Sequence, residues 1–81
     1  MYFVYALYSE KFEKFYIGYS ENPDKRLQSH NDIMNNGWTK KFQPWKIIFT
    51  EQCNSKSEAL IREKQLKTSR GRNFIHSLIQ S

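Results

Sequence analysis

Five side chains in this sequence have the types and spacing needed for chemistry on a phosphodiester bond. They are two tyrosines in aromatic segments, an arginine and a histidine one helical turn apart, and an isolated glutamate: Tyr5, Tyr16, Arg26, His30 and Glu63. Arginine offers a fixed fork of donors that matches phosphate oxygens, and histidine titrates near neutral pH and can transfer a proton. A phenol beside positive charge can accept a proton, and a carboxylate can hold a metal ion. These groups predict a metal-assisted phosphodiester site.

The carboxylate of Glu63 has the strongest support from the pattern around it. On a helical wheel with about 100° per residue, Glu63 falls inside an apolar arc. The other members of that arc are Ala59, Leu60 and Leu66. A buried charge is costly unless it is paired or binds a metal. Glu63 is therefore expected to hold a metal ion or, alternatively, to form a structural ion pair with Arg26.

The other four side chains have ordinary structural alternatives. Tyr5 and Tyr16 suit a hydrophobic core equally well. Arg26 and His30 lie at positions i and i+4, so a helix projects both from one face, which could also be a plain solvated surface. Gly18 favours a functional interpretation of the tyrosines, because a glycine inside a strand often marks the close approach of another backbone or a ligand.

The segments that hold the two tyrosines predict a β-hairpin. Residues 2–8 are apolar or aromatic at almost every position, which is typical of a strand covered on both faces. Residues 15–19 resume the strand pattern after a polar connection at residues 9–14. Because side chains alternate along a strand, the second strand is expected to divide between two faces. Tyr16 and Gly18 share one face, and the other holds Phe15, Ile17 and Tyr19.

A helix is expected directly after the hairpin. Asn22 is a good N-cap and Pro23 suits the first helical position, so the helix is predicted to run from there to about Met34. Residues 37–44 are predicted to form a polar, basic loop that contains Trp38.

The C-terminal half predicts a third strand and two more helices. The strand covers residues 45–50, with Trp45, Ile47 and Phe49 expected on one face and Lys46, Ile48 and Thr50 on the other. Ser55 and Glu58 form a capping-box pattern that opens a helix to about Ser69. After Gly71, apolar pairs repeat at helical spacing and predict a short final helix.

The order β-β-α-β-α-α predicts an α+β fold, a small antiparallel sheet with helices packed on it. A chain of 81 residues is expected to form a single domain, residues 1–81, and its 16% aromatic content compensates for a small core. Cys53 is the single cysteine, which fits a reducing compartment. The apolar run at residues 2–8 is too short for a signal peptide or a membrane span, so the cytoplasm is expected and no membrane partner.

The charge balance favours a polyphosphate partner. The net charge is +5 and the isoelectric point is near 9.5, with the excess concentrated in residues 56–72. A solvated helix face is the alternative. Trp38 and its basic neighbours also mix aromatic and cationic groups, as single-strand binding surfaces do. The cations expected to contact nucleic acid are Lys40, Lys41, Arg62, Lys64, Lys67, Arg70 and Arg72.

From Tyr2 to Ile79 the chain resembles the GIY-YIG nuclease superfamily, and in particular the small stand-alone members that are similar to the N-terminal nuclease domain found in bacterial excision repair. The segment Tyr16-Ile17-Gly18 matches the second tripeptide of the family. Phe3-Val4-Tyr5 stands where the first tripeptide would be and retains only its tyrosine. Asn73 comes slightly early for the asparagine that many members carry, and His76 has no assigned role.

The resemblance implies a three-stranded antiparallel sheet flanked by helices, and a Mg²⁺-dependent (or Mn²⁺-dependent) DNA endonuclease in repair or recombination. Glu63 would be the metal ligand, Arg26 would stabilise the phosphoryl group, and Tyr5 would activate water with help from Tyr16 or His30. Arg26, the metal and a charged His30 would supply the positive charge that the phenol needs to act as a base. The alternative is a weakly active or non-catalytic nucleic-acid-binding module on the same fold, with a protein partner supplying specificity. A partner-binding protein without a nucleic-acid role is a third possibility.

Overall fold

The computed structural model describes residues 1–32 and 37–79. Three strands form an antiparallel sheet in the order β2-β1-β3, flanked by helices, which confirms the predicted fold class. The elements are β1 (Tyr2–Ser9), β2 (Lys14–Ser20), α1 (Pro23–Asn31), the 3₁₀ helix η1 (Trp38–Phe42), β3 (Lys46–Cys53), α2 (Lys56–Leu66) and α3 (Ser69–Ile79). In the part of the chain that the structure describes, no helix is both long and apolar enough to cross a membrane.

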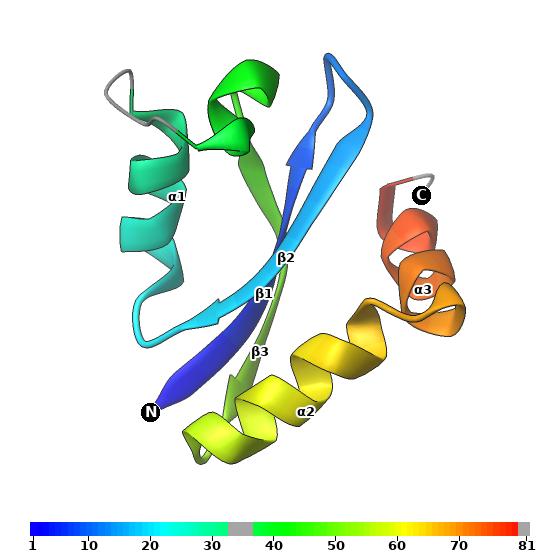
Figure 1. The fold of residues 1–81 in the computed structure, drawn as a ribbon. Coiled ribbons are helices and arrows are strands. Elements are labelled where there is room, and N and C mark those ends of the chain that lie inside the picture. Colours follow the sequence, from blue (N-terminus) through cyan, green and yellow to red (C-terminus); the bar gives the residue numbers. More distant parts are fainter. Residues whose placement is uncertain (33–36, 80–81) are drawn as a thin grey trace.

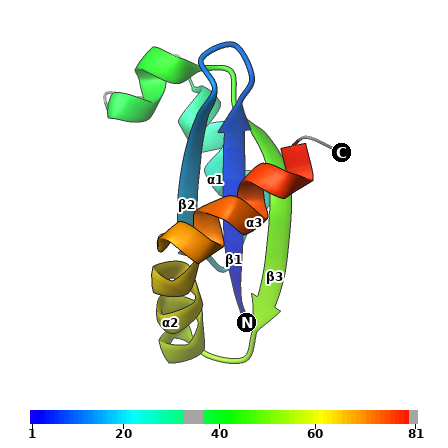
Figure 2. The same ribbon diagram turned by 90° about the vertical axis from the view of Figure 1, so that its right-hand side faces the viewer.

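The sheet separates two layers of helices. In Figure 1, α1 lies on one face of the sheet, and α2 and α3 lie on the opposite face. Figure 2 shows α2 and α3 in front of the sheet, with α3 crossing the strands. Because β1 is the central strand, it is covered on both faces, as its continuous hydrophobicity predicts.

Alternate residues of β1 and β2 divide between two hydrophobic clusters. The cluster under α2 and α3 contains the buried residues Val4, Ala6, Ile17, Cys53, Ala59, Leu66 and Ile75. The cluster under α1 contains Tyr5, Leu7 and Trp45, with Tyr16 packed against it. The predicted division of β2 is therefore confirmed, with Tyr16 on the α1 face and Phe15, Ile17 and Tyr19 on the other.

The face assignment predicted for β3 is wrong at Phe49. The register of β1 with β3 shifts between Ala6 and Leu7, which pair with Phe49 and Ile47. A β-bulge of this kind places two residues of one strand opposite one of its partner and reverses the alternation beyond it. Ile47 therefore packs on the α1 side, whereas Ile48 and Phe49 both pack on the side of α2 and α3.

The helix N-caps follow the predicted chemistry. The Asn22 side chain accepts a hydrogen bond from the Lys25 amide at 3.1 Å, and Pro23 is the first residue of α1. Ser55 Oγ accepts from the Glu58 amide at 3.2 Å and opens α2. The expected end of α1 near Met34 lies outside the described residues, and α1 itself ends at Asn31.

The boundary between α2 and α3 differs from the prediction. The helix expected to reach Ser69 ends at Leu66, and α3 begins at Ser69, before Gly71. Thr68 caps α3, because its hydroxyl accepts a hydrogen bond from the Gly71 amide at 3.3 Å. A Cβ atom on Gly71 would lie 2.3 Å from the Leu66 Cα atom. Gly71 therefore allows the two helices to meet closely, and it does not interrupt α3.

The segment before β3 is folded rather than an open loop. Residues 38–42 form η1, and the Gln43–Pro44 peptide bond is cis. Trp45 is buried, and its indole N–H donates to the Thr39 carbonyl at 2.8 Å. Asn31, the last residue of α1, exchanges hydrogen bonds with the backbone N–H and C=O of Trp45 at 2.6 and 2.9 Å. These contacts attach the end of α1 to the start of β3.

Candidate active site

Four of the five predicted site residues line one cleft at the edge of the sheet. The cleft has a volume of about 360 Å³ and is formed around the edge strand β2, with α1 and α2 each contributing one residue. Its lining residues are Tyr5, Tyr16, Gly18, Tyr19, Ser20, Arg26 and Glu63. Groups from both helical layers therefore meet where the sheet ends.

Gly18 is the residue that lets Tyr5 reach this edge. Tyr5 pairs with Gly18 across β1 and β2, and it is 1% exposed. A Cβ atom on Gly18 would lie 2.8 Å from the Tyr5 hydroxyl and 3.1 Å from a ring carbon of Tyr16. The missing side chain thus leaves the space in which the two phenol rings lie, with ring centroids 6.3 Å apart.

The environment of Tyr5 favours the neutral phenol. Burial raises the pKa of Tyr5 above its ordinary value, and a hydrogen bond from the Arg26 side chain opposes that increase. Nearby Tyr16 and Glu63 raise the pKa further, whereas the Arg26 charge lowers it. Tyr5 is consequently protonated near neutral pH, and it can serve as a base only where additional positive charge is present.

His30 lies beside the cleft instead of lining it. Its ring packs against Tyr16 with centroids 4.5 Å apart, and its Nδ1 atom is 3.2 Å from the Thr39 hydroxyl. Burial lowers the pKa of His30, and the positive charge of Arg26 lowers it further. Burial beside an arginine therefore favours the neutral ring of His30 in the free protein and opposes the positive charge expected there.

Glu63 points from α2 into the cleft with its side chain 16% exposed. Its helix neighbours Ala59 and Leu66 are buried, in agreement with the apolar arc predicted from the sequence. The carboxylate pairs with Lys67 one turn later at 3.2 Å, so the ion pair expected as the alternative, with Arg26, is replaced by a pair within α2.

The chemistry of this donor set fits a magnesium ion. Mg²⁺ keeps several water molecules and is held by one or two carboxylates together with phosphate oxygens of a substrate. Glu63 supplies one carboxylate at the wall of an open cleft, with room for waters and a phosphate. Within residues 1–32 and 37–79, no group of three His, Cys, Asp or Glu side chains could enclose a metal. A site of this type depends on substrate to complete its coordination.

The cations of the C-terminal half lie on more than one surface. Arg62 pairs with Glu51 of β3 at 2.9 Å and shares a hollow with Arg70. Lys67 and Arg72 line a different groove beside β2. The cations of residues 56–72 therefore divide between different surfaces, because successive positions of α2 and α3 face different directions. Lys40 and Lys41 of η1 and Lys64 of α2 are exposed.

Three residues of the site region were missed by the sequence prediction. Tyr19 and Ser20 line the cleft from the end of β2. Thr39 is 4% exposed and contacts His30 and Trp45, so it positions the residues behind Tyr16. Tyr19 could have been found from its place next to Gly18. Thr39 carries no local signal, because its role depends on the fold of residues 38–42.

Comparison with known proteins identifies similar chains. A family model described as the GIY-YIG catalytic domain matches residues 1–74. Among curated proteins, a UPF0213 protein of Staphylococcus saprophyticus is 38% identical over 53 residues, which is 65% of both chains. UPF0213 proteins of Staphylococcus haemolyticus and Staphylococcus aureus are 38% and 36% identical over the same share. The match thus spans 65% of these relatives' length. No solved structure is significantly similar.

Proposed function

The chain belongs to the GIY-YIG catalytic domain family, a family of nucleases, and we propose that it is a divalent-metal-dependent endonuclease that hydrolyses phosphodiester bonds in DNA. A role in DNA repair or recombination is part of this proposal. The observation that carries it is the meeting of Tyr5, Arg26 and Glu63 in one cleft, from three different elements.

Glu63 would hold the metal ion, Mg²⁺ or Mn²⁺, at the wall of the cleft. When bound, such an ion supplies Lewis-acid stabilisation of a phosphoryl oxygen and orients the leaving group. A largely buried carboxylate that keeps an open cleft beside it suits this role. In the absence of the ion, Lys67 neutralises the carboxylate.

Arg26 would bind the phosphoryl oxygens from the opposite wall of the cleft. Its side chain is exposed at the first turns of α1 and still reaches Tyr5 through a hydrogen bond. A guanidinium held in this way stabilises charge that grows on the phosphoryl group in the transition state. Removing one such group typically costs about 10² to 10³ in rate.

Tyr5 would position the attacking water and take its proton. The phenol would first release its own proton to solvent in the open cleft, and the resulting phenolate, which the Arg26 charge stabilises, would then take the proton of the water. Tyr16 lies beside Tyr5, and His30 packs behind Tyr16. His30 is therefore a positioning residue that fixes the ring of Tyr16, and Tyr16 limits the movement of Tyr5.

The experiment that tests this function is cleavage of supercoiled plasmid and branched DNA, with and without Mg²⁺ or Mn²⁺. Metal-dependent nicking by the wild type is expected, and Glu63→Gln should abolish it while DNA affinity is retained. Glu10→Gln is the matched control. Glu10 lies in the hairpin turn, and its exposed carboxylate pairs with Lys46 of β3. Equal loss of cleavage in both variants would show that Glu63 has no specific role in catalysis.

A binding module with little catalysis is the second candidate. The pair between Glu63 and Lys67 favours it, since this contact gives the carboxylate a structural partner without any metal. The module predicts that the wild type cleaves none of these substrates and binds DNA in a salt-sensitive way. It also predicts that Glu63→Gln changes folding stability and leaves no activity to lose.

A further inference from the structure

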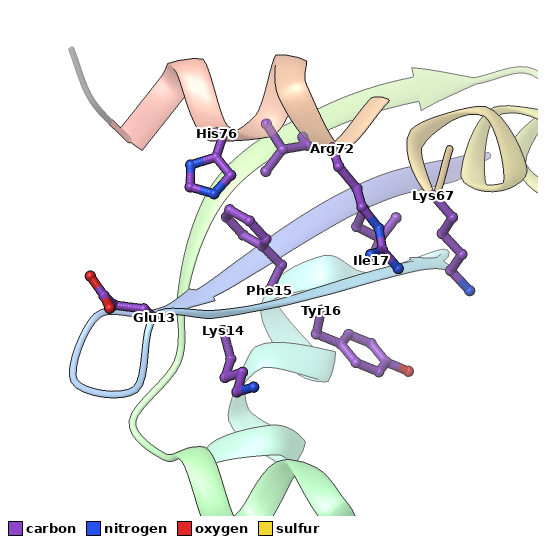
Figure 3. A pocket seen from close by; sticks show the side chains of 9 residues that line it. Glu13, Lys14, Phe15, Tyr16, Ile17, Lys67, Arg72 and His76 are labelled. Carbon is purple, nitrogen blue, oxygen red and sulfur yellow. The ribbon is translucent and has the colours of Figure 1, made fainter. Parts of the chain in front are cut away.

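A second concave surface lies next to the cleft, between the edge strand β2 and helix α3. This surface, which we call the β2–α3 groove, has a volume of about 630 Å³. Residues 13–17 line one side, and Lys67, Arg72, Ile75 and His76 line the other. Figure 3 shows the rings of Phe15 and His76 near each other at one end, and Arg72 and Lys67 extending toward β2 at the other.

The groove has an aromatic part. Phe15 and His76 contact each other edge to face, with ring centroids 5.1 Å apart and planes at 84°. Ile17 and Ile75 are buried beneath them and belong to the core. His76 itself is exposed, so a planar group can reach its ring without disturbing the core. Aromatic side chains in such positions stack with nucleic-acid bases.

The groove also has a cationic part. Arg72 is exposed and, within the described residues, takes part in no ion pair. Lys67, the C-cap residue of α2, contributes a second cation. An arginine and a lysine beside an aromatic pair provide both a phosphate contact and a base contact, which is the combination found in single-strand binding surfaces.

The groove is continuous with the cleft through two residues. Tyr16 lines both, since its strand separates them. Lys67 lines the groove and also bonds to Glu63 in the cleft at 3.2 Å. A ligand in the groove therefore lies next to whatever occupies the cleft.

We propose that the β2–α3 groove is a subsite for an unpaired nucleotide next to the scissile phosphate, with Lys67 and Arg72 on its phosphate and its base against His76. This assignment rests on the proposed nuclease function. It also names the substrate class, because a base inside a duplex is already paired and stacked and cannot lie on His76. The preferred substrates are therefore single-stranded, flapped or branched nucleic acids, rather than continuous duplex.

The test measures binding by fluorescence anisotropy in metal-free buffer, in the Glu63→Gln background, so that no cleavage interferes. The probes are a labelled single strand, a flap, a fully paired duplex and a single strand with an abasic position. We expect the single strand and the flap to bind about tenfold more tightly than the duplex, which is the size of one base-stacking contact. His76→Ala should remove this preference and make the intact and abasic strands bind alike.

Arg72→Gln should weaken binding of all four probes by about tenfold, as expected for the loss of one charge-assisted contact. The matched control is Lys11→Gln, because Lys11 is an exposed cation of the hairpin turn that lines a different hollow. Its affinity should stay within about twofold of the parent. Both Arg72 and His76 are exposed, so neither substitution is expected to unfold the protein.

The subsite would be overturned by equal binding of duplex and single strand, by unchanged binding in His76→Ala, or by an equal effect of Lys11→Gln and Arg72→Gln. A nucleoside monophosphate that binds as tightly as the single strand would also overturn it, because the ligand would then be a free nucleotide. Failure of the nuclease function has a different signature: the wild type cleaves nothing while the His76 and Arg72 effects on binding persist.

Discussion

The hydroxyl group of Tyr5 lies directly over Gly18, where any Cβ atom would stand 2.8 Å from the phenol oxygen. The two residues are paired across β1 and β2, so the contact is set by the register of the hairpin. A side chain at position 18 would force the Tyr5 hydroxyl to shift, and this hydroxyl is the group on which the Arg26 side chain acts. The glycine therefore connects a backbone position of the edge strand to the geometry of the cleft.

Gly18→Ala should destabilise the protein and reduce cleavage, because the added methyl group overlaps the Tyr5 hydroxyl. Overpacking of this kind costs about 1–3 kcal/mol, measured as the free energy of unfolding in urea. The control is a double-mutant cycle with Tyr5→Phe, which removes the overlapping oxygen. If Gly18→Ala costs as much in the Tyr5→Phe background as in the wild type, the hydroxyl is not the atom that the glycine accommodates.

The buried His30 predicts a pH dependence of stability. The folded state lowers the pKa of His30, so the unfolded chain binds a proton more readily, with an ordinary value near 6.5. The stabilisation is therefore fully present above about pH 6.5 and is lost as the pH falls through the folded-state pKa. Urea unfolding between pH 5 and 8 measures this slope.

His30→Gln should flatten the slope of stability against pH below neutrality, because a glutamine does not titrate. His76→Gln is the control, since His76 is an exposed histidine on α3. A slope that disappears in His76→Gln and persists in His30→Gln would contradict the assignment to His30.

The parts of the site that sequence could predict are those set by local periodicity. Strand alternation placed Tyr16 and Gly18 on one face of β2, and the helical wheel placed Glu63 on the apolar side of α2, where its side chain is 16% exposed. The sequence could not predict that Glu63 pairs with Lys67 and not with Arg26, because a pair with Arg26 depends on the distance between α1 and α2.

The fold prediction is wrong where the conformation of one segment depends on how another element packs against it. The bulge opposite Ala6 and Leu7 depends on the pairing of β1 with β3, so the alternation within residues 46–53 alone could not predict that Phe49 changes face. Gly71 resembles a helix break, since a glycine at a helix end and a glycine at a close helix contact look the same in a sequence.

Gly71→Ala should be strongly destabilising, because its Cβ atom would lie 2.3 Å from the Leu66 Cα atom and backbone cannot rotate away as a side chain can. The expected cost is about 3 kcal/mol, at the upper end of overpacking effects. The control is Gly37→Ala, because Gly37 is exposed and has a φ of −77°, which alanine adopts readily. Similar unfolding free energies for the two variants would show that the α2–α3 contact relaxes freely.

Lys67→Met tests whether the lysine competes with a metal ion for Glu63. The pair is partly exposed, with side chains 52% and 16% accessible, so its loss should change the unfolding free energy by less than about 0.5 kcal/mol. Removing the competing cation should raise the affinity for Mn²⁺ about fivefold, close to the 1 kcal/mol expected for charges about 4 Å apart in water. Calorimetric titration of Mn²⁺ into the DNA-free protein measures this change directly.

Lys64→Met is the matched control for this titration. Lys64 is an exposed lysine next to Glu63 in the sequence, and it makes no ion pair within the described residues. An Mn²⁺ affinity that is the same in the Lys67 and Lys64 variants would mean that the ion binds away from Glu63, and the carboxylate would then be a structural partner of Lys67.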